Sequence, residues 1–360
     1  RCSASCCIFN NICFFLYNLK NSGINFPLFF YHNTLSIHMI YCTIFSTTIF
    51  LVVNLMYADL VCKGGGVKGI ALVGALSYFE ECGYVWKKVA GTSVGAIIAS
   101  LVAVGYSASE IKDIMYNLDY KKFTDKNALQ SVPFVGSLLS LFYCKGIYAG
   151  DYVENFLREK FELKGKKYFK DIYENNESKL KVIATDVTNH KLVVLPDDLV
   201  KYNIDPMEFE IAKAVRMSLS IPFFFNPVIL NKNENPSYIV DGGLLSNFPI
   251  WIFDVNDKPR WPTFGFNLFN DVESTPSNCQ SLIPFLIDVV ETSLDTSEQI
   301  YFKDSDAIRI VNIPTFGISA INFDITKKEM IKLYNSGYNS AKCFLNNWCF
   351  DNYIRNYRRK

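Results

Sequence analysis

The chain has 360 residues, with 36 lysine and arginine residues against 35 aspartate and glutamate residues and a net charge of +1. This balance gives no electrostatic reason to expect nucleic acid as a partner. Half of the residues are apolar and 15% are aromatic, which excludes a globally disordered chain.

Residues 1–55 form a hydrophobic leader that is poor in charge and sustains no helical or strand period. Its most apolar part, Met39–Leu55, is short for a membrane-spanning helix, which needs about 20 residues. A second methionine, Met56, directly precedes the first strand pattern. We expect residues 1–55 to be non-native sequence translated in frame, or disordered; a real hydrophobic anchor is the alternative. A mass spectrum of the native protein that starts at Met56 would favour the first interpretation and exclude the anchor.

A strand is predicted at Asp59–Lys63, followed by the glycine-rich sequence GGGVKG at residues 64–69 and an amphipathic helix at Ile70–Glu81. The backbone N–H groups of such a turn serve equally well to bind phosphate or an oxyanion. The sequence is not a P-loop, because the Gly-Lys-Ser/Thr ending is absent, and it lacks the GxGxxG spacing of a dinucleotide fold. Lys68 either adds positive potential here or lies in solvent.

A second predicted strand, Val85–Ala90, leads into GTSVG at residues 91–95 and a helix of small residues at Gly95–Val104. GxSxG between a strand and a helix is typical of a nucleophile elbow, in which the serine occupies a strained turn that bulky neighbours would block. The N-terminus of the following helix favours the negative charge that develops there. A glycine-bracketed serine in an ordinary loop is the alternative, which the strand-to-helix context disfavours.

The order strand, helix, strand, helix predicts an α/β fold with a parallel sheet and right-handed crossovers. The apolar segment Val132–Tyr143 is interpreted as a cap or membrane-touching lid, with a buried core helix as an equal alternative. Further strands are predicted at Lys181–Thr185, Lys191–Leu195, Tyr238–Val240, Thr263–Asn267 and Ala307–Val311. Further helices are predicted at Ser109–Asn117, Ala149–Lys160, Pro206–Met217, Ser281–Ile300 and Lys327–Trp348.

The serine needs a base, and histidine is a poor candidate for that role in this chain. Of the three histidines, His32 and His38 lie in the leader, and His190 falls in a predicted turn, where we expect it to be exposed. His190 also precedes the acidic candidates, against the Ser…Asp…His order of α/β-hydrolases. Asp241, followed by Gly242 and Gly243 at a predicted strand end, supplies a carboxylate instead. A tight Asp-Gly turn is the structural alternative.

The eleven cysteines form no CxxC pair and no Cys/His group with zinc-site spacing, so we find no metal site. Scattered cysteines indicate free thiols in a reducing compartment and thus a cytoplasmic location. We predict one domain at residues 56–350, followed by a basic C-terminal tail at residues 351–360. This tail is either solvated or weakly attracted to anionic lipid.

Together and in this order, GGGVKG, GTSVG and the DGG at residues 241–243 resemble the motifs of the patatin-like phospholipases, notably the bacterial members. The similarity extends to Ala214–Pro222, to Asn247–Pro249 and to the Phe323-Asp-Ile block, and it covers about residues 57–348.

The resemblance implies a three-layer α/β/α fold with a mostly parallel central sheet, and a calcium-independent lipid acyl hydrolase without a cofactor. It implies Ser93 as nucleophile, Asp241 as base and an oxyanion hole at Gly64, Gly65 and Gly66. The motif-supporting residues would be Lys68, Gly69, Gly91, Gly95, Gly242 and Gly243. The implied partner is a phospholipid or lysophospholipid at a membrane surface, to which the protein would bind peripherally; secretion as an effector stays open.

Two alternatives remain at this point. One is a small-ester esterase or thioesterase on the same Ser-Asp dyad, which rates on short-chain and long-chain esters would distinguish. The other is a non-catalytic lipid- or phosphate-binding module that uses the glycine-rich turn, although such a module has no use for an exposed elbow serine. The sequence specifies neither head-group and sn-position preference, nor an activator, nor the oligomeric state.

Overall fold

A mostly parallel β-sheet organises the part of the chain that the computed structural model describes, residues 55–125, 136–174, 176–231, 235–271, 282–296 and 303–358. The strand order is β12-β11-β1-β2-β6-β10-β9, with β7 also paired to β6. The pairs from β12 to β6 are parallel, whereas β7, β10 and β9 pair antiparallel. These strands are β1 Met56–Cys62, β2 Tyr84–Thr92, β6 Leu180–Asp186, β7 Lys191–Leu195, β9 Val228–Leu230, β10 Ser237–Asp241, β11 Thr263–Phe269 and β12 Ile310–Pro314. The predicted α/β class with a mostly parallel central sheet is confirmed.

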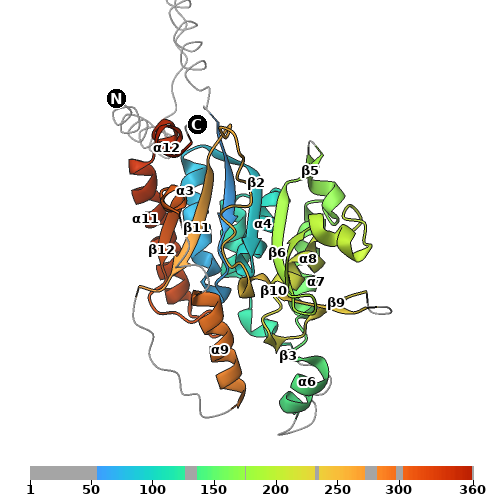
Figure 1. Cartoon of the computed structure of the whole chain (residues 1–360). Helices are drawn as coiled ribbons and strands as arrows, with labels where there is room; N and C mark the ends of the chain where they lie inside the picture. Colours follow the sequence, from blue (N-terminus) through green and yellow to red (C-terminus); the bar gives the residue numbers. More distant parts are fainter. Residues whose placement is uncertain are drawn as a thin grey trace, which may run out of the picture. The chain divides into compact units, whose positions relative to one another are not determined.

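Helices follow most of the parallel strands, as the predicted crossovers require (Figure 1). They are α3 Ile70–Glu81, α4 Val94–Ala103, α5 Ala108–Tyr116, α6 Gly136–Cys144, α7 Asp151–Leu163, α8 Ile211–Ser218, α9 Leu282–Thr296, α10 Asp304–Ala307, α11 Lys327–Asn347 and α12 Phe350–Tyr357. Short strand pairs join β3 Gly146–Tyr148 to β8 Phe223–Phe225, and β4 Tyr173–Glu174 to β5 Glu177–Ser178. Among the described residues, no helix combines the length and apolar character needed to cross a bilayer.

The two faces of the sheet are covered differently, and the alternation of side chains along β1 shows how. Leu60 and Cys62 point into the larger core, which α3, α4, α8 and α11 help to form. Val61 points to the opposite face and packs in a smaller cluster with Ala90, Phe248, Ile250 and Ile310. The second face is therefore covered in part by the segment that follows β10.

Helices α3 and α11 pack very closely, because a glycine on each faces the backbone of the other. A Cβ on Gly74 would lie 2.0 Å from the carbonyl oxygen of Tyr334, and one on Gly337 would lie 1.8 Å from that of Ala71. Neither position has room for a side chain, so this contact fixes α11 against α3.

Several predicted elements differ from the structure. The helix predicted at Pro206–Met217 begins only at Ile211, because the preceding residues pair with another segment: the N–H of Ile211 donates to Lys167 O, and that of Phe169 to Phe209 O. The strand predicted at Ala307–Val311 begins at Ile310, because Asp304–Ala307 forms a helical turn that is closed by the Arg309 N–H on Asp306 O.

The basic segment predicted as a C-terminal tail is largely helical, as α12. Tyr353 and Ile354 are buried, and the Arg358 guanidinium lies 3.2 Å from the Asp254 carboxylate. The basic charges of this segment suggest a solvated tail, and the two apolar residues that α12 buries are too few to predict a packed helix from the sequence.

Residues 1–54 of the predicted leader and residues 132–135 of the cap segment lie outside the described residues. The rest of that segment forms α6, in which Phe142 and Tyr143 are 72% and 75% exposed. This part of the segment is therefore not the fully buried core helix that was the alternative interpretation.

Strand β6 pairs with two different strands along one of its edges. Its first half pairs with β2, ending at Thr92 opposite Ile183, and its second half pairs with β10, ending at Asp241 opposite Ala184. Strand β7 pairs with the other edge over both halves. The carboxyl ends of β2 and β10 therefore meet beside two consecutive residues of β6.

Candidate active site

Ser93 occupies a strained turn between β2 and α4. Its backbone has φ 53° and ψ −127°, a region that residues with a side chain rarely adopt. The turn needs both flanking glycines: a Cβ on Gly91 would lie 2.3 Å from the backbone of Gly95, and one on Gly95 would lie 2.3 Å from Cys62 O. The predicted elbow geometry is thus present.

Asp241 ends β10 and is completely buried. Its Oδ1 accepts a hydrogen bond of 2.8 Å from the Gly243 N–H, whereas Oδ2 has no partner of standard geometry among the described residues. Burial raises the pKa of Asp241 to about 7, although the Gly243 N–H and the nearby Ser93 hydroxyl both act to lower it. The effect of the Ser93 hydroxyl places that group within hydrogen-bonding reach of the carboxyl. Because its pKa is raised, the Asp241 carboxyl binds a proton far more readily than an exposed aspartate does.

The register of β6 brings these two residues together across 148 positions of sequence. Ser93 follows the last β2 residue, paired with Ile183, and Asp241 is the last β10 residue, paired with Ala184. Thr92 strengthens the junction, because its Oγ1 donates to Ser246 O at 3.0 Å. Gly242 lets the chain turn there, since a Cβ on it would lie 2.4 Å from Ile183 O.

The glycine-rich turn lies against Ser93, and its N–H groups are not equivalent. A Cβ on Gly64 would lie 3.2 Å from the Ser93 Cβ, but the Gly64 N–H already donates to Asn247 O at 3.1 Å. Within the described part of the chain, the N–H groups of Gly65 and Gly66 donate to no other residue. The structure thus leaves Gly65 and Gly66, but not Gly64, with donors available to an oxyanion.

The remaining motif residues support this turn. Lys68 is 8% exposed and passes beside Gly65. Gly69 packs on the first residue of α4, where a Cβ would lie 2.3 Å from a Val94 methyl. His190 is exposed in the β6–β7 turn, as predicted.

A small apolar cavity of about 30 Å³ lies beside Ser93. It runs from the glycine-rich turn and the start of α4 towards α5, η2 (Tyr120–Phe123) and β8. Its lining is Gly66, Val67, Ser93, Val94, Ile97, Met115, Leu118, Tyr120, Phe123, Leu219, Ile221, Phe225, Ala320 and Phe323. An apolar cavity that reaches a strained serine suits the alkyl part of a substrate.

The motifs did not mark Ser218, the last residue of α8, or Ser220, two residues further on, as part of the site. The Ser93 N–H donates to the Ser218 Oγ at 2.9 Å, and the Asp241 N–H donates to Ser220 O at 2.8 Å. Both serines lie in the segment Ala214–Pro222, whose resemblance to the family was noted from the sequence, but that resemblance assigned them no role.

A family model described as patatin-like phospholipase matches residues 60–254. The uncharacterized protein YqhO of Bacillus subtilis (strain 168) is 36% identical over 296 residues, which are 82% of this chain and 100% of YqhO. The probable lipid hydrolase 463L of Invertebrate iridescent virus 6 is 29% identical over 194 residues, 54% of this chain and 62% of its own length. Among solved structures, VipD from Legionella pneumophila is similar with a TM-score of 0.50 at 18% identity, over 80% of this chain and 66% of VipD. This last likeness concerns the fold alone.

Proposed function

Because the chain belongs to the patatin-like phospholipase family, we propose that it hydrolyses carboxylic esters of phospholipids or lysophospholipids through a Ser93–Asp241 dyad. The observation that carries this proposal is the strained Ser93 beside a buried carboxyl with a raised pKa. Membership of the family implies lipid ester hydrolysis; the dyad and the phospholipid class are our assignment.

In the proposed first step, ionised Asp241 takes the hydroxyl proton of Ser93 while the Ser93 oxygen attacks the ester carbonyl. The negative oxygen that forms is stabilised by the N–H groups of Gly65 and Gly66 and by the N-terminus of α4. Protonated Asp241 then returns its proton to the departing alcohol, and the acyl group stays on Ser93. In the second step Asp241 takes a proton from the water that attacks the acyl-enzyme, and it then returns this proton to the Ser93 oxygen as the fatty acid leaves. Apart from water, both proposed steps use only groups of the chain, so we expect turnover in the presence of a calcium chelator.

The raised pKa of Asp241 matters for this chemistry. An aspartate near its ordinary pKa of about 3.9 is a weak base for a serine hydroxyl. A general base works best when its pKa lies near the working pH. Burial of Asp241 moves the pKa in that direction.

The test is fluorophosphonate labelling of the purified full chain, with peptide mapping, beside fatty acid release from mixed phospholipid vesicles in chelator. We expect label on Ser93 and released fatty acid. Folded protein with no label on Ser93 and no released fatty acid would contradict the proposal and favour a lipid- or phosphate-binding module.

The small volume of the apolar cavity favours a second candidate, hydrolysis of small esters or thioesters on the same dyad. A cavity of about 30 Å³ accommodates only a short acyl chain unless the surrounding side chains move. A series of p-nitrophenyl esters from acetyl to palmitoyl distinguishes the two. A maximum in kcat/KM at two to four carbons, with no release from vesicles, would favour the small-ester enzyme.

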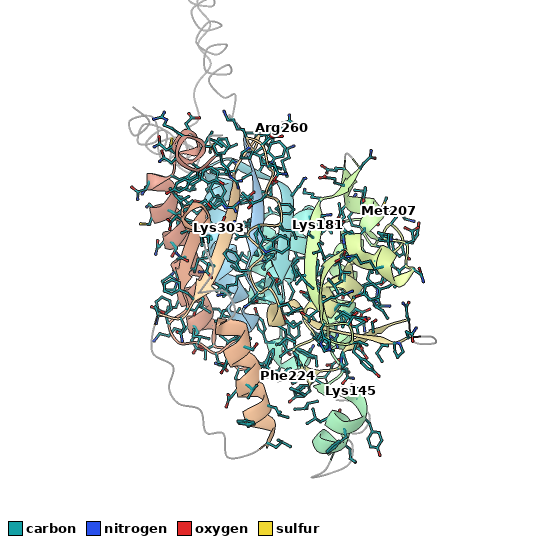
Figure 2. All side chains as sticks on the ribbon, viewed as in Figure 1. Lys145, Lys181, Met207, Phe224, Arg260 and Lys303 are labelled. Atoms are coloured by element: carbon teal, nitrogen blue, oxygen red, sulfur yellow. The ribbon has the colours of Figure 1, made fainter. Side chains whose placement is uncertain are left out.

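Exposed apolar side chains near the site favour a lipid surface as the source of substrate. On α9, which contacts the turn after Asp241 and β8, Phe285 and Val289 are 49% and 50% exposed. Figure 2 shows Phe224 of β8, which is itself buried, at the end of the sheet where α6 and α9 project. We propose that this end of the protein meets the membrane peripherally.

Activity is predicted to rise with pH through about 7. The proposed base must be ionised, and the pKa of Asp241 is raised from 3.8 to about 7. Below that pH, kcat/KM should fall about tenfold per pH unit. The measurement is kcat/KM for a neutral ester from pH 5 to 9. A flat profile down to pH 5 would mean that Asp241 is ionised throughout, or is not the base.

Gly66→Ala is predicted to lower kcat/KM by about 100-fold or more, whereas Gly65→Ala lowers it less than about tenfold. A Cβ on Gly66 would lie 1.9 Å from Ala320 O, and φ is +56° there. On Gly65 the nearest atom is the flexible Leu268 Cδ1, at 2.7 Å. Ester hydrolysis and circular dichroism of both variants provide the measurement. Equal activities would contradict a rigid oxyanion turn at Gly66.

A further inference from the structure

One short turn hydrogen-bonds to both members of the proposed dyad. The hydroxyl of Ser218, at the end of α8, accepts the N–H of Ser93 at 2.9 Å. Two residues later, the carbonyl of Ser220 accepts the N–H of Asp241 at 2.8 Å. Ser218 and Ser220 are both completely buried, so these bonds are shielded from water.

Arg216 holds this turn in place from inside the protein. Its guanidinium donates to the Ser220 Oγ at 2.5 Å, to Ala149 O at 2.5 Å and to Asn226 O at 2.9 Å. The Ser220 hydroxyl donates in turn to Arg216 O at 2.9 Å, which closes a loop of hydrogen bonds around the turn.

The environment of Arg216 is costly for a cation. Arg216 is 3% exposed, and burial lowers its pKa against the opposing effect of the Glu154, Asp151 and Asp125 carboxylates, none of which forms a salt bridge with it. A buried charge without a carboxylate partner opposes folding unless its hydrogen bonds compensate. Gly150 makes room for it, because a Cβ at that position would lie 2.4 Å from the guanidinium.

We propose that Arg216, Ser218 and Ser220 act as positioning residues that fix the distance between Ser93 and Asp241; this rests on the proposed function. Ser218 binds the N–H of the strained elbow and so holds Ser93 at its unusual backbone angles. It also occupies that N–H, which leaves the oxyanion to Gly65 and Gly66. The Ser220 carbonyl accepts the Asp241 N–H and so fixes the backbone that carries the carboxylate, whose Oδ2 has no partner of standard geometry in the described part of the chain.

The role predicts a specific kinetic effect. A displacement of about 1 Å between reacting groups can lower a rate about 100-fold without weakening substrate binding. Loss of the Ser218 hydroxyl should therefore reduce kcat and the rate of fluorophosphonate labelling while KM stays within about twofold. A hydroxyl that serves stability alone would lower the melting temperature but not these two rates.

The test compares Ser218→Ala with Ser77→Ala in the full chain. Ser77 is a matched control, since it is a buried helical serine on α3 whose hydroxyl donates to Val73 O at 2.9 Å. We expect Ser218→Ala to lower kcat and the labelling rate about 10- to 100-fold, and Ser77→Ala to leave both within about twofold. Ser218→Ala with rates equal to the control, while wild-type Ser93 is labelled, would overturn the proposal.

A second variant covers the case in which Ser218→Ala does not fold. Ser220→Ala keeps the Ser218 bond and the Ser220 carbonyl but removes the hydroxyl that Arg216 binds. It should lower kcat at unchanged KM, and wild-type kcat in this variant would overturn the proposal. Failure of the proposed function has a different outcome, since wild-type protein would then show neither label on Ser93 nor fatty acid release.

Discussion

Ser93→Ala is expected to reduce ester hydrolysis about 10⁴-fold or more, because no other group can form the proposed acyl-enzyme. Alanine keeps the Cβ, so the strain at φ 53° and the packing of the elbow stay the same. Residual activity would come from the oxyanion turn and substrate binding alone. The measurement is kcat/KM for a long-chain ester, together with loss of fluorophosphonate labelling.

Ser100→Ala is the matched control for this variant. Ser100 lies on α4, two turns after the elbow, and its buried hydroxyl donates to Ile97 O at 2.8 Å. This change should leave activity within about twofold, because a serine bonded back to its own helix contributes little. Activity that survives Ser93→Ala but falls in Ser100→Ala would contradict Ser93 as the nucleophile.

Asp241→Asn is expected to lower kcat about 10³- to 10⁴-fold while the protein stays folded. An amide has nearly the same shape but cannot take the proton of Ser93. Its oxygen can still accept the Gly243 N–H, which preserves the turn after β10. Full activity in a folded Asp241→Asn variant would refute the dyad.

The same substitution should change how stability depends on pH. The folded-state pKa of Asp241 is raised to about 7 from 3.8, so the protonated carboxyl is favoured in the folded protein. Its contribution to the free energy of unfolding is fully present below pH 3.8 and is lost as the pH rises to about 7. Each pKa unit corresponds to about 1.36 kcal/mol, so the loss reaches up to about 4 kcal/mol.

The amide side chain of the Asp241→Asn variant would not ionise, and the stability of this variant relative to the wild type should therefore increase by up to about 4 kcal/mol between about pH 4 and about pH 8. Urea unfolding of both proteins across this range provides the measurement. A constant difference between them would mean that Asp241 is already ionised in the folded protein at acid pH.

Local patterns predicted the regular elements well where their boundaries carry strong signals. The helix at Ile70–Glu81 and the strand at Lys191–Leu195 have the predicted limits, because glycines or turn residues bound them. The helix predicted from Pro206 failed at its start, since backbone pairing with residues 167–169 replaced helical bonds there. Propensity describes neighbours in sequence and cannot include such a partner.

In the candidate site, too, features with a local sequence motif were predicted, whereas features that depend on distant contacts were not. Ser93, Asp241 and the glycine-rich turn were identified from their motifs, since steric need restricts the residue types at these positions. The Gly64 N–H is excluded as an oxyanion donor only because it binds the carbonyl of Asn247, which is distant in sequence. The roles of Ser218 and Ser220 likewise depend on their hydrogen bonds to Ser93 and Asp241, which lie at the ends of β2 and β10. These contacts exist only after the sheet has formed.

The pairing of β6 has a consequence for how this chain can change in length. Thr92 and Asp241 lie opposite consecutive residues, Ile183 and Ala184, so insertions or deletions elsewhere between them leave their spacing intact. One residue inserted between Ile183 and Ala184 would separate the two strand ends by about 3.3 Å more and turn one set of side chains to the other face. Natural variation in length should therefore accumulate in the connections around β6 and avoid β6 itself.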